Sequence, residues 1–217
     1  MDIEFRLVFY FHQKVFLYYQ NKTKMSKSTL IFATANKHKI AEVSKVINHE
    51  KYEFLSLAEV GITEEIIEDG ETLEENALIK ARYVYNKLEK NVFSEDTGLE
   101  VFSLGGDPGV YTARYGGPQK NADDNMDLLL KNLEGKESRE AQFRAVIALI
   151  INGKEVLFEG IIKGEIAVKK SGNEGFGYDP IFIPEGFDQS FADLPDEVKL
   201  SRSHRSRAIA KMVDFLE

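Results

Sequence analysis

The chain has 217 residues, of which 43% are hydrophobic and 29% charged, proportions typical of a globular protein with a packed core and not of a disordered chain. It contains no cysteine, which excludes disulfides, thiolate metal sites and a cysteine nucleophile and is compatible with the cytoplasm, where we expect the protein to act. The formal net charge of −8 argues against a broad basic face for nucleic acid but leaves room for a small anion bound by a few converging cations.

The first 24 residues stand apart from the rest of the chain. They are rich in aromatic residues, but His12, Gln13 and Lys14 interrupt the apolar run, and no stretch reaches the about 18 apolar residues that span a bilayer. A secretory signal would also need a small-residue cleavage site, and none is evident in this segment. We expect translation to begin at Met25, with 1–24 as an extension outside a domain at 25–217. A membrane-surface or targeting segment is the alternative.

The first half of the domain alternates strand and helix patterns. We expect a strand over 29–34, a helix over 37–47 and a second strand over 52–57. Thr72 and Glu75 form a capping-box pattern that predicts a helix over 73–90. A short strand over 91–94 then ends in Glu95-Asp96-Thr97-Gly98, followed by an apolar stretch over 99–104 and a Gly-rich loop over 105–109.

The second half adds an antiparallel hairpin. We expect a helix over 121–133, then two strands over 141–151 and 155–162 joined at the turn Asn152-Gly153. Residues 164–168 extend the sheet, 175–184 are too irregular for a helix, and a last helix covers 203–216. This order predicts a single mixed α/β domain with a hairpin inside a larger sheet.

The turn at 34–39, between the first strand and the first helix, is a candidate anion site. Backbone N–H groups and the positive end of the helix meet there, and Lys39 adds a charge in the first turn. The alternative is a lysine that is merely solvated at a helix start.

Acidic residues gather before the second helix and at the end of the third strand. Acids favour helix N-termini on general grounds, but Glu68 precedes the cap, where it can face a cleft, and Lys80 follows 12 residues later. Glu95 and Asp96, at a strand end, are hard oxygen ligands of the kind that suits Mg²⁺. The alternatives are a solvated Lys80 and a simple Asp-containing turn.

Two further segments can contact a planar base. Gly175-Phe176-Gly177-Tyr178-Asp179-Pro180 combines aromatic rings with a flexible backbone, although a buried aromatic turn is equally compatible with it. Ser203-His204-Arg205 begins the last helix, where Ser203 can act simply as a cap. The chain shows neither a Ser–His–Asp order nor an HExxH helix.

Together these segments resemble the inosine triphosphate pyrophosphatase family, also described as XTP/dITP or non-canonical purine NTP pyrophosphatases. The likeness covers 29–216. The matching blocks, in order, are TANKHK at 34–39, EDGETLEENALIKAR at 68–82, SEDTGLEV at 94–101, GGDPGVYTARYGG at 105–117 and GFGYDPIF at 175–182, completed by Lys199 and Ser203-His204-Arg205.

The resemblance implies an elongated, two-lobed α/β fold with a mixed sheet, flanking helices and a central nucleotide cleft. It also implies a Mg²⁺-dependent homodimer. The reaction it implies is hydrolysis of ITP, dITP and XTP between the α and β phosphates, which gives a monophosphate and pyrophosphate and cleanses the nucleotide pool.

The resemblance also assigns roles to residues. Glu68 and Asp96 would bind Mg²⁺, and Asp96 would be the proton acceptor that activates water, so Asp96, Glu68 and Lys80 form the catalytic set. Lys39 and Lys80 would counter the phosphate charge. The substrate-binding residues would be Thr34, Ala35, Asn36, Lys37, His38 and Lys39 at the triphosphate, Thr97 beside it, and Phe176, Gly177, Tyr178, Asp179, Lys199, His204 and Arg205 around the base and sugar.

Base choice has a physical basis in this assignment. Arg205 and Lys199 only donate hydrogen bonds, so they suit the C6 carbonyl of hypoxanthine or xanthine and are left unpaired by adenine, a mismatch that can discriminate by about 10⁴-fold. The chain departs from the family in having Ala35 for a usual Gly and Glu95 for a frequent Asp. A non-hydrolysing nucleotide sensor and a pyrophosphatase for modified pyrimidines are the competing hypotheses.

Overall fold

The computed structural model describes residues 27–47 and 51–217, so the predicted extension over 1–24 and the start at Met25 lie outside the described residues. Seven strands form one sheet in the order β2-β1-β3-β5-β6-β7, with β4 paired to β3. The strands are β1 (Ser28–Phe32), β2 (Tyr52–Ser56), β3 (Val92–Val101), β4 (Pro108–Gly109), β5 (Glu140–Ile151), β6 (Lys154–Ile166) and β7 (Phe182–Pro184).

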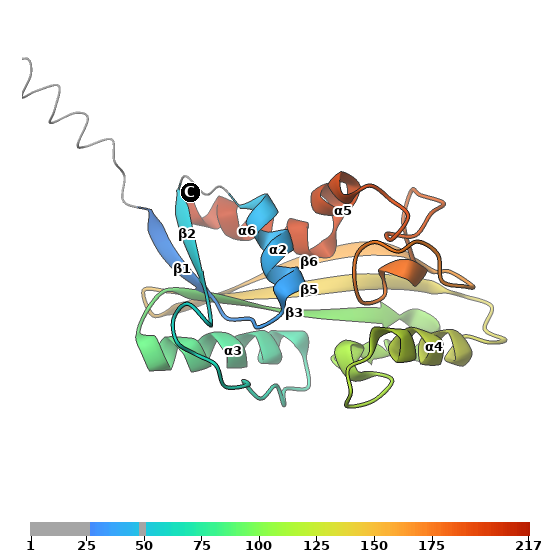
Figure 1. The fold of residues 1–217 in the computed structure, drawn as a ribbon, viewed down its shortest axis with the longest axis horizontal. Coiled ribbons are helices and arrows are strands. Elements are labelled where there is room, and N and C mark those ends of the chain that lie inside the picture. The colour runs from blue at the N-terminus through green and yellow to red at the C-terminus, as the bar shows by residue number, and fades with distance from the viewer. Residues whose placement is uncertain (1–26, 48–50) are drawn as a thin grey trace, which may run out of the picture.

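The sheet is parallel at one end and antiparallel at the other. β1 runs parallel to β2 and β3, whereas β3, β5, β6 and β7 are successively antiparallel. β3, β5 and β6 are long enough to extend through the whole molecule (Figure 1). They therefore form a shared base on which two lobes are built.

Helices cover both faces of this base. α2 (Lys37–Val46), α5 (Asp196–Arg202) and α6 (His204–Leu216) lie on one face, and α3 (Leu73–Leu88) and α4 (Ala122–Asn132) lie on the other (Figure 1). None of the described helices is long and apolar enough to cross a membrane. The described residues also form three short 3₁₀ helices: η1 (Phe102–Leu104), η2 (Thr112–Arg114) and η3 (Asp179–Ile181).

Alternation along the strands explains how two cores flank one sheet. On β1, Phe32 faces the cluster that packs under α2 and α6, and its neighbour Ile31 faces the cluster under α3, because successive strand residues point to opposite faces. A third cluster, with Leu129 of α4 and Phe182 of β7, fills the far lobe. The elongated, two-lobed mixed-sheet fold expected from the sequence is confirmed.

Most helix and turn signals are confirmed, one prediction is wrong and one helix was missed. Thr72 and Glu75 form the expected capping box, and Ser203 caps α6. However, β3 does not end at 94 but continues to Val101, since it pairs with β5 along its entire length. Gly98 lies within the paired strand and not in a turn. Its missing side chain lets β4 approach, because a Cβ there would lie 2.9 Å from the oxygen of Gly109 on β4. α5 was not expected either, because its polar sequence DEVKLSR has no apolar period.

Candidate active site

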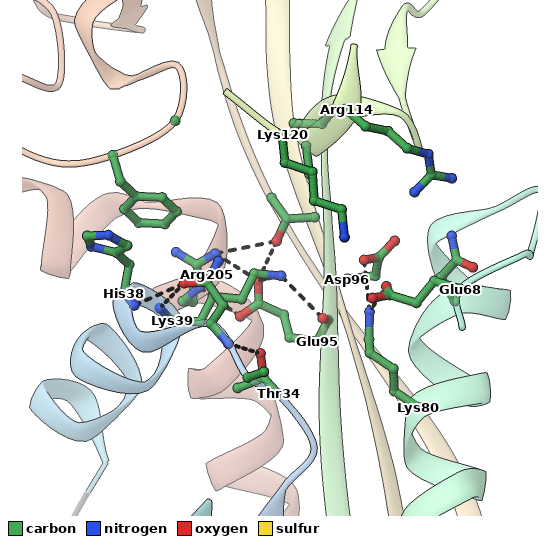
Figure 2. Close-up of a pocket in the computed structure, with 18 of the residues that line it drawn as sticks. Thr34, His38, Lys39, Glu68, Lys80, Glu95, Asp96, Arg114, Lys120 and Arg205 are labelled. Atoms are coloured by element: carbon green, nitrogen blue, oxygen red, sulfur yellow. Dashed lines mark hydrogen bonds and ion pairs between the residues drawn. The ribbon is translucent and has the colours of Figure 1, made fainter. Parts of the chain in front are cut away.

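A cavity of about 740 Å³ lies between the lobes, and segments far apart in the sequence line it (Figure 2). The turn into α2, the loop before α3, the middle of β3, the 176–179 segment and the start of α6 all contribute. Every predicted site residue lines it except Lys37, which is an exposed first residue of α2. The contact of Lys37 with a ligand therefore stays a prediction.

The turn into α2 is held by its own side chains. Asn36 is the N-cap, and its Oδ1 accepts hydrogen bonds from the backbone N–H of His38 at 2.9 Å and of Lys39 at 3.2 Å. The N–H of Asn36 donates to Thr34 Oγ1 at 3.2 Å. These local bonds fix the turn at the positive end of the helix, where an anion is favoured.

Glu95 is the centre of a buried ion-pair network on the α2 and α6 side of β3. Arg205 Nε and Nη2 donate to its two carboxylate oxygens at 2.7 and 2.9 Å, and Lys39 Nζ lies 3.5 Å from its Oε1. Burial would raise the pKa of Glu95, but Arg205 and Lys39 outweigh it and hold the pKa far below its usual range. Glu95 is thus an ionised anchor for two cations of the cavity wall.

The network continues through Glu42 of α2, which sequence analysis did not identify. Glu42 pairs with Arg205 Nη1 and with Lys199 Nζ at 2.7 Å, and Lys199 also contacts Asp179 Oδ2 at 2.6 Å. No sequence signal marked Glu42, because it is one acid in a charged helix. Burial raises the pKa of Asp179 in spite of Lys199.

On the α3 side of the same strand, Lys80 lies between two carboxylates. It forms a hydrogen-bonded ion pair with Glu68 and contacts Asp96 Oδ1 at 3.0 Å. Lys80 is buried, so the interpretation of this residue as a solvated lysine is wrong. Glu95 and Asp96, although adjacent, thus serve opposite walls, because the strand continues through them.

The two carboxylates beside Lys80 differ in basicity. Burial raises the pKa of Asp96, and the neighbouring charge of Glu68 adds to this rise. Burial acts in the same direction on Glu68, but Lys80 outweighs it, and the pKa of Glu68 is lowered. Environments that separate two pKa values in this way are typical of acid–base sites, and Asp96 is the more basic member.

The donor set is compatible with Mg²⁺ bound jointly by protein and ligand. Glu68 and Asp96 offer hard oxygens on one wall of the cavity. Within the described part of the chain, no group of three or more His, Asp or Glu side chains is placed to hold a metal ion. Mg²⁺ characteristically takes one or two carboxylates and completes its shell with water and phosphate oxygens, so this pair leaves coordination positions for the oxygens of a phosphate ligand.

The other end of the cavity is aromatic and cationic. The rings of His38 and Phe176 stack at 4.9 Å, and Lys199 Nζ lies 4.5 Å from the Phe176 ring centre. Phe176 is positioned by its backbone N–H, which donates to Asp179 Oδ2 at 2.7 Å. Gly175 must lack a side chain here, because a Cβ would lie 2.2 Å from that same oxygen and its φ is +80°.

His204 is buried in this end of the cavity with both ring nitrogens unpaired among the described residues. Its ring stacks on Phe143 at 4.8 Å. Burial, reinforced by Arg205, lowers its pKa well below the usual value, so the ring is neutral and retains one donor and one acceptor. Buried polar atoms in this state normally find a partner, which indicates a polar ligand.

The cavity combines a helix N-terminus that favours anions with aromatic rings that can stack on a planar base. These features place this α/β protein in the nucleotide-binding class. Comparison with known proteins then specifies the family. Residues 30–215 match the family model described as the Ham1 family. The chain therefore belongs to the Ham1 family, and the resemblance drawn from its motifs is confirmed.

Individual relatives align with this chain along nearly their whole length. A dITP/XTP pyrophosphatase from Flavobacterium johnsoniae is 51% identical over 187 residues, which cover 86% of this chain and 97% of that protein. The dITP/XTP pyrophosphatase of Bacillus subtilis is 44% identical over 190 residues, covering 86% and 96%. The structure of the Staphylococcus aureus Ham1 protein superposes with a TM-score of 0.80 at 37% identity, over 87% of this chain and 98% of that one.

Proposed function

We propose that this chain hydrolyses non-canonical purine nucleoside triphosphates (ITP, dITP and XTP) to the monophosphate and pyrophosphate. The observation that carries the proposal is the division of one cavity into two ends. Glu68, Lys80 and Asp96 occupy one end, and the stacked His38 and Phe176 rings occupy the other. The relatives named dITP/XTP pyrophosphatases support dITP and XTP among these substrates.

In the proposed reaction Asp96 accepts a proton from the attacking water. Asp96 lines the cavity and is held by Lys80 at 3.0 Å, and a positioned base contributes about 10²–10⁴-fold to a rate. Lys80, held by both carboxylates, places a positive charge where phosphate oxygens gather. Attack by water requires no covalent nucleophile.

Glu68 and Asp96 are the residues that would hold Mg²⁺. A divalent ion at phosphate oxygens neutralises the charge that develops as the phosphoanhydride breaks. The turn at 34–39 would hold the phosphate chain through its helix start, and Lys39, whose pKa burial lowers, is a cation enclosed within the cavity wall.

Lys199, Arg205 and His204 would recognise the base. Arg205 uses three N–H groups on Glu95 and Glu42 and a fourth on Thr97 Oγ1 at 3.5 Å. A guanidinium has five, so Arg205 retains one donor for the C6 carbonyl of a hypoxanthine or xanthine ring. Phe176 would stack on the base. This arrangement supports a purine with an oxygen at C6.

The experiment is release of pyrophosphate from ITP, XTP, dITP, GTP, ATP and dTTP, with and without Mg²⁺, by the wild type and Asp96→Ala. The proposal expects Mg²⁺-dependent turnover of ITP and XTP far above GTP and ATP, lost in the variant. Binding of ITP without turnover would instead establish a nucleotide sensor. A preference for a pyrimidine would show that the base pocket is misassigned.

The proposal extends to the setting of the enzyme. We place it in the cytoplasm, where it would remove deaminated purine nucleotides before polymerases use them, and we expect a homodimer. Localisation of a tagged chain and light scattering of the purified protein test these two statements.

A further inference from the structure

We propose that Arg114 of η2 binds the two terminal phosphates of the substrate, the half that leaves as pyrophosphate. This assignment rests on the proposed function. Arg114 lines the cavity from the lobe opposite α2 and α3, and it belongs to the segment GGDPGVYTARYGG, to which sequence analysis assigned no chemical role.

The charge balance of the cavity leaves a need for a further cation. Its lining contains equal numbers of cations and carboxylates: Lys39, Lys80, Arg114, Lys120, Lys199 and Arg205 against Glu64, Glu65, Glu68, Glu95, Asp96 and Asp179. A neutral lining of this kind gives little net attraction to a triphosphate. Affinity for the phosphate chain must therefore come from cations that carboxylates of the site do not already neutralise.

Five of the six cations are already paired. Lys39 and Arg205 contact Glu95, Lys80 contacts Asp96, Lys199 contacts Asp179, and Lys120 contacts Glu65 at 3.0 Å. Arg114 differs from them. Within residues 27–47 and 51–217 it has no carboxylate partner, and its guanidinium lies 5.2 Å from the ring centre of Tyr111.

The backbone that carries Arg114 is fixed on both sides. Thr112 Oγ1 accepts a hydrogen bond from the N–H of Leu99 on β3 at 2.8 Å. Asn125 of α4 donates to the oxygen of Ala113 at 3.1 Å and accepts from the N–H of Gly116 at 2.5 Å. Gly116 is packed so closely that a Cβ would lie 2.8 Å from the backbone of Asp124. A free side chain on a rigid backbone is what a preorganised binding residue requires.

The direction of Arg114 identifies the phosphates it would meet. Its guanidinium lies at the end of the cavity occupied by Glu68 and Asp96, away from His38 (Figure 2). If the base stacks at Phe176, the α phosphate lies near Asp96 and the remaining phosphates extend past it toward Arg114. The planar guanidinium suits two phosphate oxygens at once.

The test compares Arg114→Ala and Arg114→Lys with Arg202→Ala. Arg202 is a matched control, because its guanidinium also lies over a ring, that of Phe187 at 5.7 Å, but it is exposed and outside the cavity. Binding of Mg²⁺-pyrophosphate and of IMP is measured by calorimetry, and KM for ITP by pyrophosphate release. Loss of a charge-assisted bond predicts that Arg114→Ala weakens pyrophosphate binding by about 10- to 100-fold and raises KM, with IMP binding unchanged.

The outcomes separate this inference from the proposed function. Turnover of ITP by the wild type tests the function, whereas pyrophosphate binding tests Arg114 whether or not the wild type turns over. Partial recovery in Arg114→Lys would support a phosphate contact. Unchanged pyrophosphate binding in Arg114→Ala, or an equal weakening of IMP and pyrophosphate, would overturn the assignment, since the latter is the signature of a structural role.

Discussion

Arg205 donates to both carboxylate oxygens of Glu95, at 2.7 and 2.9 Å, across 110 residues of sequence. Both side chains are almost completely buried, so this forked pair joins α6 to β3 inside the wall of the cavity. A second fork, between Arg82 and Glu155 with both distances at 2.6 Å, lies on the surface. The two pairs have similar geometry and differ in burial.

Glu95→Gln is expected to destabilise the fold far more than Glu155→Gln. Removing one partner of a buried pair costs about 3–5 kcal/mol when the other charge is left uncompensated. Arg205 keeps its pairing with Glu42 in this variant, so the cost lies toward the lower end of that range, whereas an exposed pair contributes about 0–1 kcal/mol. Urea unfolding followed by far-UV circular dichroism measures both, because the chain has no tryptophan for fluorescence. Equal effects in the two variants would contradict the role given to burial.

His204 is expected to make stability depend on pH. Burial and the neighbouring Arg205 keep its folded-state pKa well below the usual value, so below pH ~6.5 the unfolded chain takes up a proton that the folded chain does not. Stability therefore falls as the pH drops from ~6.5, by up to about 1.4 kcal/mol per pH unit from this residue. His204→Phe keeps the stack on Phe143 and should lose this dependence. Urea unfolding at several pH values gives the difference curve, and parallel curves for the two proteins would rule out the effect.

Gly160→Ala is expected to impair both stability and activity. A Cβ at Gly160 on β6 would lie 2.0 Å from the oxygen of His204 and 2.5 Å from the nitrogen of Ala208, so α6 would have to move away from the sheet. Such overpacking costs about 1–3 kcal/mol and would displace His204 and Arg205 from the cavity. Lys163→Ala, at an exposed position of the same strand, is the control. Thermal unfolding and kcat/KM for ITP are the measurements, and an unaffected kcat/KM would show that α6 tolerates the shift.

Local signals in the sequence predicted local structure well. The Thr72 capping box and Ser203 are caps whose hydrogen bonds connect residues within three positions of one another, so spacing alone identifies them. Motif blocks likewise identified the residues that line the cavity. The errors concern long-range packing. The Asp-Thr-Gly sequence in β3 has the composition of a turn, and pairing with β5 overrides it.

Contacts between residues far apart in the chain could not be predicted from the sequence either. Lys80 is buried because α3 packs beside β3 and brings it to Asp96, and Glu42 contacts Arg205, 163 residues away. No spacing rule links such pairs. Lys37 illustrates the reverse case: it lies inside a matched motif, yet the first turn of α2 leaves it exposed.

Mg²⁺ is expected to bind strongly only together with nucleotide. Glu68 and Asp96 both interact with Lys80, and the described residues supply no third carboxylate or imidazole beside them, so phosphate oxygens must complete the metal's shell. Mg²⁺ alone should therefore leave the melting temperature almost unchanged. An ITP analogue with a non-hydrolysable α–β bridge should raise it more with Mg²⁺ than without, because a ligand at about 100 times its Kd stabilises the folded state by about 2.7 kcal/mol.

Glu68→Gln should weaken metal binding, measured as the Mg²⁺ dependence of ITP turnover. The variant retains the size of the side chain but loses the anionic ligand, so the Mg²⁺ concentration for half-maximal turnover should rise by at least about tenfold, since even loss of a supporting group around a metal costs about 10–100-fold. Glu65→Gln is the matched control, because Glu65 also lines the cavity but is highly exposed and pairs with Lys120. If Mg²⁺ alone stabilised the wild type as much as Mg²⁺ with the analogue, the protein would possess a complete metal site, and Glu68 and Asp96 would not be its sole ligands.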